Sequence, residues 1–270
     1  SATNSFILGY GAGSNALTLQ TGGTVNTTND VHIGFVPTAT ANSVTISDAG
    51  SVWSVGGTFY AGSESSSNSL TISAGGKLAV DTKDLLIGAT TTTSGADSNT
   101  VVVTGTGSLL SNTNGTLYVG RGGSQNSLQI KSGATASTKN VRIGGGSGAT
   151  GAPSSNTAVV DGTGSVWNVS GTLRVGAGVA GTASGLDITD GGVVNVTGNS
   201  FLGYDATTDN NYVYVDGAGS KLNAASLTIG NALNSTGNKV RLSNGGTLAA
   251  TSITIGHQSG LEIGNGGAAG

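Results

Sequence analysis

A repeat of about 27 residues constrains the fold of this chain more than any other feature. Each unit reads Asn-Ser-Leu-x-Ile, then Gly-Gly-x-Leu, then Leu-x-Ile-Gly. The glycines that close the units are Gly9, Gly34, Gly62, Gly88, Gly120, Gly144, Gly176, Gly203, Gly230 and Gly256. A fixed period of roughly 20–50 residues is typical of stacked supersecondary units that share one continuous core. The repeat therefore predicts a solenoid, not a globular domain folded around a pocket.

The third unit shows how one repeat is built. Apolar and polar residues alternate over residues 68–72, which is the period-two pattern of a half-buried strand. Residues 74–76 contain two glycines that permit the positive φ of a corner. Alternation resumes over residues 78–80 and again over residues 85–87, just before Gly88. Each unit thus predicts three short strands separated by corners.

These patterns predict an all-β chain with almost no helix. The expected fold is a single-stranded parallel β-helix (β-solenoid) of about ten coils of ~27 residues, with three short strands per coil. We expect residues 1–270 to form one β-solenoid domain. The chain has no methionine and opens in the middle of a unit, so we expect it to be a fragment of a longer repeat protein.

One polar position recurs at the start of the first strand of almost every unit. It is occupied by Asn15, Asn42, Asn68, Asn99, Asn126, Asn156, Asn211 and Asn238, with Gly185 as the apparent exception. Stacked asparagine amides can hydrogen-bond along a stack of strands. We therefore expect a structural asparagine ladder inside one corner, although asparagine also suits a turn that precedes a strand.

Composition argues against several classes of function. Only 9% of the residues are charged and the net charge is −3, so no basic surface for nucleic acid is expected. No apolar run approaches the roughly 18 residues needed to span a bilayer as a helix. The chain has no cysteine, and its stability must therefore come from stacking without disulfide bonds.

The sequence offers no convincing catalytic or metal site. The 13 acidic residues are scattered, and those in Asp-Gly pairs suit turns. His32 and His257 are far apart in the expected stack, which argues against zinc. Trp53 and Trp167 fall in an apolar column, so core filling is favoured over stacking on a sugar. We expect no enzyme activity, no cofactor and no metal.

One column that should face outward differs in composition from the other outward columns. Its candidate binding residues are His32, Tyr60, Leu86, Tyr118, Arg142 and Arg174, with Leu202 expected at the equivalent place in a shorter unit. Histidine, tyrosine and arginine on a surface of serine, threonine and glycine are typical of a contact face. Tyrosine and arginine also cover a flat sheet well, and the sequence leaves both interpretations open.

The segment Gly164–Gly176 reads Gly-Ser-Val-Trp-Asn-Val-Ser-Gly-Thr-Leu-Arg-Val-Gly, and Asn68–Gly76 reads Asn-Ser-Leu-Thr-Ile-Ser-Ala-Gly-Gly. These repeats resemble the passenger regions of bacterial autotransporters and related large secreted β-helical surface proteins. The resemblance covers nearly the whole chain. It implies an extracellular rod on a bacterial cell surface that acts in display or adhesion, as an adhesin, filament or surface-layer subunit.

Alternative functions on the same fold make different demands on the sequence. A glycan-binding or glycan-cleaving β-helix, of the polysaccharide lyase or tailspike type, needs acids and bases clustered over adjacent coils. An ice-binding solenoid needs a regular threonine array, but the threonine column ends after Thr71. The expected partners of a rod are other copies or flanking coils stacked end to end, together with a surface glycan or a host cell surface.

The terminal units show no polar cap. Phe6–Gly9 already reads as a regular third strand, and Leu261–Gly264 reads as a regular first strand. Uncapped solenoid ends expose strand backbone and apolar side chains. We therefore expect both ends to meet further coils or another subunit.

Overall fold

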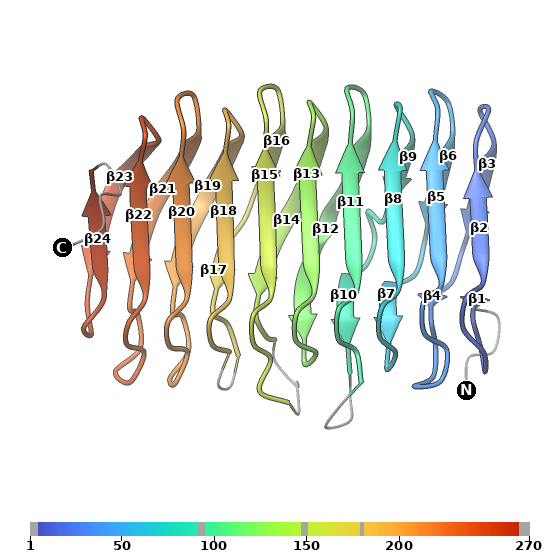
Figure 1. Cartoon of the computed structure of the whole chain (residues 1–270), viewed down its shortest axis with the longest axis horizontal. Helices are drawn as coiled ribbons and strands as arrows, with labels where there is room; N and C mark the ends of the chain where they lie inside the picture. The colour runs from blue at the N-terminus through green and yellow to red at the C-terminus, as the bar shows by residue number, and fades with distance from the viewer. Residues whose placement is uncertain (1–4, 91–94, 147–150, 179–180, 265–270) are drawn as a thin grey trace.

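The computed structural model describes residues 5–90, 95–146, 151–178 and 181–264. The chain is all-β over these residues, which contain no helix. Its strands pair in parallel and form a β-solenoid, as the repeat predicts. Figure 1 shows the coils stacked along the long axis of the molecule. One sheet has ten strands, and a complete turn of the solenoid separates each strand from the next, which gives about nine complete turns.

One sheet contains the first strand of every coil. Its members pair in the order β2 (Ala16–Leu19), β5 (Ser43–Ser47), β8 (Ser69–Ser73), β11 (Thr100–Thr104), β13 (Ser127–Lys131), β15 (Thr157–Asp161), β18 (Gly185–Thr189), β20 (Tyr212–Asp216), β22 (Lys239–Ser243) and β24 (Gly260–Ile263). The register runs without a shift through all of these pairs, for example Leu70 to Val101 to Leu128. Because one face of each strand is buried, a slip by one residue would expose the whole apolar column.

The second sheet combines the second and third strands of the coils. Separate second strands are β3 (Thr24–Thr27), β6 (Val52–Val55), β9 (Lys77–Ala79) and β16 (Val166–Val169). Separate third strands are β1 (Phe6–Leu8), β4 (Val31–Ile33), β7 (Phe59–Ser63), β10 (Leu85–Ala89) and β17 (Leu173–Val175). In five coils the two run together as β12 (Leu109–Arg121), β14 (Thr135–Ile143), β19 (Val193–Leu202), β21 (Lys221–Ile229) and β23 (Thr247–Ile255).

The merged strands differ from the expected three short strands per coil. Where β12 pairs with β14, the register shifts between Asn112 and Thr116, and β19 shifts against β21 between Val196 and Asn199. A β-bulge of this kind bends a strand without ending its pairing. The second corner is therefore a bend within one sheet in these coils, and the second and third strands of the coils belong to the same sheet.

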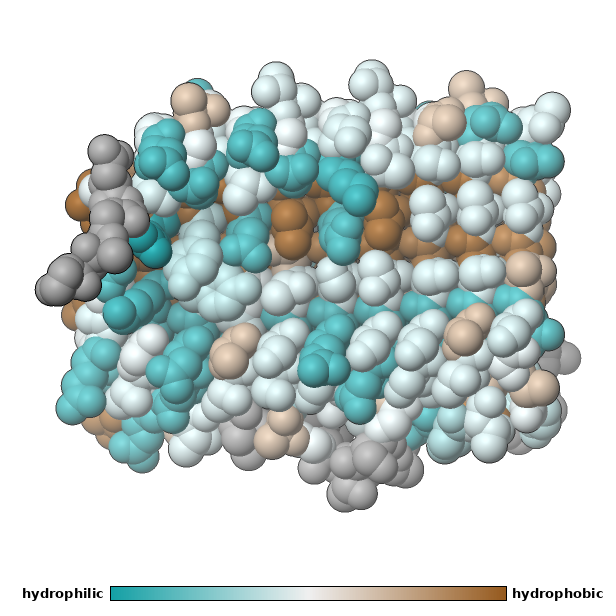
Figure 2. Space-filling view, viewed as in Figure 1, coloured by the Kyte–Doolittle hydropathy of each residue, from teal (hydrophilic) through white to brown (hydrophobic). Residues whose placement is uncertain are grey.

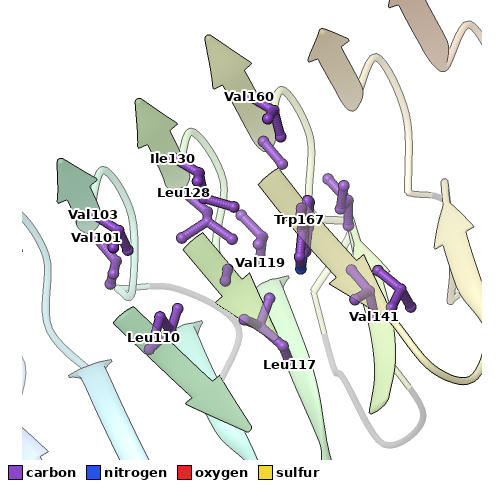
Figure 3. Packing of buried hydrophobic residues seen from close by; sticks show 14 of the residues in the cluster. Val101, Val103, Leu110, Leu117, Val119, Leu128, Ile130, Val141, Val160 and Trp167 are labelled. Carbon is purple, nitrogen blue, oxygen red and sulfur yellow. The ribbon is translucent and has the colours of Figure 1, made fainter. Parts of the chain in front are cut away.

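A single apolar core fills the space between the two sheets. Figure 3 shows side chains from both sheets pointing toward one another, among them Leu128, Ile130 and Trp167. Trp53 and Trp167 are fully buried, which confirms the prediction that they fill the core. The indole Nε1 of each donates a hydrogen bond to a threonine of the preceding coil, Thr27 at 3.3 Å and Thr138 at 3.1 Å.

The outer face of the ten-stranded sheet is mainly polar. Figure 2 shows this face mainly as pale and teal residues, with brown confined largely to a band that runs along the long axis of the rod, across the strands. The described parts of the connections between the third strand of one coil and the first strand of the next lie together along one edge of the rod, at the bottom of Figure 1. The length variation of the repeat therefore falls on a single edge.

Candidate functional site

The asparagine column forms a hydrogen-bonded ladder along the solenoid. Each Nδ2 donates to the Oδ1 of the next asparagine, from Asn15 to Asn42 (2.8 Å), Asn42 to Asn68 (2.9 Å) and Asn68 to Asn99 (2.9 Å). The same contacts continue through Asn126 to Asn156 (3.1 Å) and join Asn211 to Asn238 (3.1 Å). Each Oδ1 also accepts the backbone N–H of the preceding asparagine, for example Asn68 N to Asn99 Oδ1 at 2.9 Å. All members except Asn15 are buried.

The ladder explains the glycine that closes each unit. Gly62 has a φ of 82°, and a Cβ placed on it would collide with the carboxamide of Asn99. Gly88 and Gly120 stand in the same relation to Asn126 and Asn156. The closing glycine therefore serves two purposes: it turns the chain, and it leaves room for the amide of the next coil.

The ladder position that lacks asparagine is Ser184 and not Gly185. Ser184 donates its backbone N–H to Asn211 Oδ1 at 2.9 Å, and its hydroxyl accepts the N–H of Asn156 at 3.3 Å. The exception therefore lies one residue earlier than predicted, whereas Leu186 and Ile188 of the same unit occupy their predicted columns. Gly185 lies instead beneath the ring of Tyr212, where any Cβ would overlap the ring.

The predicted binding residues share one column on the outer side of the third strands. His32 pairs with Tyr60, Tyr60 with Leu86, Leu86 with Tyr118, Tyr118 with Arg142, and Arg142 with Arg174. The next member is Phe201 and not Leu202, which is buried in the core. We use the term stripe for His32, Tyr60, Leu86, Tyr118, Arg142, Arg174 and Phe201.

The expectation of an exposed stripe is wrong for three of its residues. His32, Leu86 and Tyr118 are only 7%, 1% and 8% exposed, whereas Tyr60, Arg142 and Arg174 are half-buried. The reason is that residues directly after a closing glycine pack against the third strands, as Phe35 does against His32. Leu86 and Tyr118 form a small apolar cluster with Ala89, and the backbone at Gly146 lies against the Tyr118 ring.

Two residues of the stripe, His32 and Tyr60, form the floor of a groove of about 380 Å³. The groove is lined by His32, Phe35, Val36, Pro37, Tyr60, Ser63, Glu64, Ala89, Thr90 and Arg121. The rings of His32 and Tyr60 are stacked, with centroids 4.5 Å apart and an interplanar angle of 6°. Phe35 meets His32 edge-on at 4.8 Å, and exposed Tyr10 stacks on Phe35 at 5.7 Å. Four rings from three coils thus form one continuous aromatic surface.

Charged groups occupy the other side of the groove. Glu64 follows β7, and its carboxylate accepts a hydrogen bond from the Thr90 hydroxyl at 2.7 Å. Arg121 ends β12, where its guanidinium lies 5.6 Å from the centroid of the Tyr118 ring. A short antiparallel bridge between Ala89 and Gly122 holds these two segments together.

Burial controls the protonation of the two titratable rings in the floor. It lowers the pKa of His32, against the opposing effect of the Asp30 carboxylate, so that the imidazole is neutral at pH 7. Burial and the charge of Asp30 raise the pKa of Tyr60, although nearby Arg121 acts in the opposite direction. The floor is therefore an uncharged aromatic surface at neutral pH.

Cations and aromatic rings contact one another further along the stripe. Tyr118 lies between Arg121 and Arg142, whose guanidinium carbon is 5.9 Å from the ring centroid. Arg174 lies over Tyr204 at 3.8 Å and over Phe201 at 5.9 Å. These cation–π contacts hold the long side chains flat against the sheet.

Sequence reasoning missed a second set of residues that pack beside the stripe. Tyr10, Phe35, Arg121 and Tyr204 each follow a closing glycine directly, and each contacts another aromatic ring. The available signal was an aromatic residue or arginine at the position directly after the closing glycine. This position lies beside a stripe of similar composition. It could be interpreted only once the direction of the returning chain was known.

A metal centre finds no support in the described part of the chain. No three His, Asp or Glu side chains lie close enough there to hold a metal ion. No helix within these residues is long and apolar enough to cross a membrane.

A separate cluster of titratable groups lies on the outer face of the ten-stranded sheet. The Tyr212 hydroxyl is 3.5 Å from the Asp187 carboxylate, and the Tyr212 ring stacks on Tyr214 with centroids 4.5 Å apart. Burial, together with the adjacent Asp187 charge, raises the pKa of Tyr212 to about 12. Burial also raises the pKa of Asp187, despite the hydrogen bond from Tyr212.

We expect the free energy of unfolding to fall as the pH rises from about 10 to about 12, because the folded protein keeps the Tyr212 proton after the unfolded chain has lost it. Two pKa units correspond to about 2.7 kcal/mol, which solvent screening of the half-buried phenol reduces to the order of 1 kcal/mol. Urea unfolding across this range should show the full loss in the wild type and in Tyr10→Phe, and a smaller loss in Tyr212→Phe, in which Tyr60 with its raised pKa still contributes. If the free energy of unfolding had the same pH dependence in all three proteins, the pH dependence would not arise from Tyr212.

Comparison with known proteins identifies no relative: no protein-family model, no curated protein and no solved structure matches the chain.

Proposed function

We propose that the chain is a structural or adhesive rod that acts at a bacterial cell surface. The observation that carries this proposal is the unbroken register of ten parallel strands around one core. A stack of this kind has a constant rise of about 4.8 Å per coil and is held together by contacts between neighbouring coils alone. The number of coils in such a stack fixes the distance between its two ends. The connections along one edge of the rod can display side chains over that length. The repeats' resemblance to secreted surface proteins supports the location.

The partner that we propose for the rod is a further parallel coil. Ile255 of β23 and Ile263 of β24 are 49% and 75% exposed, whereas the equivalent Ile229 of the preceding coil is fully buried. A coil that adds parallel strands to β23 and β24 covers these side chains and satisfies their backbone groups. The same contact is available to coils of one polypeptide and to a second copy.

The proposal is tested on intact cells that produce the protein. An antibody against the chain should label them without permeabilisation. Deletion of residues 99–155 removes two coils and brings Asn156 next to Asn68, so that the asparagine ladder stays continuous. The antibody should still label cells that carry the shortened rod, and the rod should remain on the cell surface. The outer end of the rod should lie about 10 Å closer to that surface.

Two results would contradict the rod function. One is labelling that requires permeabilisation. The other is turnover of acidic or neutral polysaccharides by the purified chain, provided that a single carboxylate substitution such as Glu64→Gln abolishes it. The expected result of the second assay is no new reducing end and no unsaturated uronate.

A further inference from the structure

Two neighbouring arginines of the stripe, Arg142 and Arg174, carry positive charge that the fold does not neutralise. They are direct partners in the parallel strands β14 and β17, so their Cα atoms lie about 4.8 Å apart. Like charges opposite one another on adjacent strands are unfavourable unless another group compensates them. Within the described part of the chain, neither guanidinium makes a hydrogen bond or an ion pair. We call these two residues the arginine pair.

Aromatic rings hold the arginine pair from its two outer sides. The guanidinium carbon of Arg142 lies 5.9 Å from the ring centroid of Tyr118 in the preceding coil, and that of Arg174 lies 3.8 Å from the centroid of Tyr204 in the following coil. A ring attracts the flat face of a guanidinium group, which leaves the N–H donors at its edge for other partners. Arg174 Nε is shielded from solvent and has no hydrogen-bond acceptor among the described residues. A bound acceptor would remove the cost of that unpaired donor.

Small residues occupy the position that covers the stripe in another coil. Phe35 directly follows a closing glycine and packs against His32, which is 7% exposed. The residues at the same position in the coils of the arginine pair are Gly145 and Ala177. Neither has a side chain that could lie over a guanidinium group, and both arginines are only half-buried.

The carboxylate that follows Tyr204 is already engaged within the fold. Asp205 Oδ2 accepts the backbone N–H of Gly178 at 2.6 Å. No ion pair joins Asp205 to Arg174 in the part of the chain that the structure describes. An anion from outside the chain is therefore the group that can neutralise the arginine pair.

We propose that the arginine pair binds a phosphate group, either as the free anion or as a monoester of a larger molecule. Both oxygens of a planar carboxylate are used by a single guanidinium fork. A phosphate monoester has three terminal oxygens and about −1.5 to −2 charges at pH 7, so it can accept from both forks and match both positive charges. The inference goes beyond the rod function and does not depend on it.

The test is a titration of the whole purified chain with sodium phosphate, glucose 6-phosphate, sodium acetate and glucose. Ionic strength is held constant, because salt screens exposed charges. Calorimetry measures the affinities, and NMR follows the Nε–Hε signals of the arginines. Phosphate should bind at millimolar concentration and shift the signals of Arg142 and Arg174, whereas acetate should bind about fivefold more weakly or worse and glucose should not bind. Tighter binding of glucose 6-phosphate than of phosphate identifies the ligand as an ester, and equal or weaker binding identifies it as the free anion.

Variants assign the binding to the arginine pair. Arg142→Gln and Arg174→Gln should each weaken phosphate binding about fivefold or more, and the double variant should abolish it. Arg174→Lys keeps the charge but loses the planar fork, so it should bind phosphate more weakly than the wild type. Arg241→Gln is the matched control, because Arg241 lies on β22 in the other sheet, and it should have no effect. Circular dichroism and urea unfolding check that each variant is folded.

The proposal is overturned if phosphate and glucose 6-phosphate do not bind at about 10 mM, or if acetate binds as tightly as phosphate. It is also overturned if folded Arg142→Gln binds phosphate as well as Arg241→Gln does. These outcomes are independent of the cell assays for the rod function, which do not require any anion to bind.

Discussion

Replacement of Asn99 by alanine should lower the free energy of unfolding by about 3 kcal/mol. The Asn99 carboxamide is fully buried and makes four hydrogen bonds. Its Oδ1 accepts from the backbone and side-chain nitrogens of Asn68, both at 2.9 Å, and its Nδ2 donates to Ser65 O at 3.0 Å and Asn126 Oδ1 at 3.1 Å. Alanine leaves the Asn68 N–H buried without an acceptor, and each such group costs about 1–3 kcal/mol.

Equilibrium urea unfolding measures the loss, and amide hydrogen exchange locates it. The Asn68 amide should exchange faster in Asn99→Ala because its only acceptor is removed. The matched control is Asn195→Ala on the outer surface. Asn195 also has amide contacts in both directions, to Asn168 at 2.9 Å and from Asn223 at 2.8 Å, but water can replace them. The control should lose less than about 1 kcal/mol. Equal losses for the two variants would contradict a special role for the internal ladder.

A double-mutant cycle tests whether the closing glycine serves the ladder. Gly62→Ala should cost about 3 kcal/mol, because alanine is strained at a φ of 82° and its Cβ displaces the Asn99 carboxamide. In the Asn99→Ala background the same change should cost only about 1 kcal/mol, which leaves the backbone strain. Gly22→Ala is the control, since Gly22 has a φ of 74° and no atom near its would-be Cβ. Strict additivity of Gly62→Ala and Asn99→Ala would refute the steric link.

Replacement of Trp167 by alanine should lower the free energy of unfolding by about 4 kcal/mol, the usual range for a buried tryptophan being about 3–5 kcal/mol. The indole lies between Ala136 of one neighbouring coil and Val194 of the other, and it is fully buried. Because Ala136 is small, no neighbouring side chain can fill the resulting cavity. The change also removes the hydrogen bond from Nε1 to Thr138 Oγ1.

Urea unfolding measures the free energy of unfolding of each variant, and the m-value should be the same as in the wild type. Trp167→Phe retains most of the ring volume and should lose roughly half as much stability. Tyr214→Ala removes an aromatic ring that is 39% exposed and should lose less than about 1 kcal/mol. A Trp167→Ala protein as stable as Trp167→Phe would show that the coil collapses around the vacant space, against the packing described for Ala136.

The sequence was sufficient for the fold because its two signals repeat together. Period-two alternation identifies each strand, and the 27-residue period aligns the strands into columns, so that Leu70, Val101 and Leu128 could be assigned to one buried column without coordinates. Trp53 and Trp167 could be assigned to the core for the same reason. The chance of a wrong register grows where a unit is irregular, as at Gly185 and Leu202. Both were misplaced by one residue, which moves a side chain from one face of the strand to the other.

The sequence by itself determined the parallel solenoid, its apolar columns and the position of the asparagines, because all of these follow from local alternation repeated at a fixed period. Only the tertiary structure decided that the chain returns over the third strands and covers His32, Leu86 and Tyr118. That path depends on the left-handed conformation at the closing glycines from Gly9 to Gly230 and on contacts with the next coil, such as Gly62 against Asn99. The groove at Tyr60 likewise joins Phe35, Glu64 and Arg121, which lie far apart in sequence. A pattern of single residues cannot encode such a juxtaposition, because it arises when the coils stack.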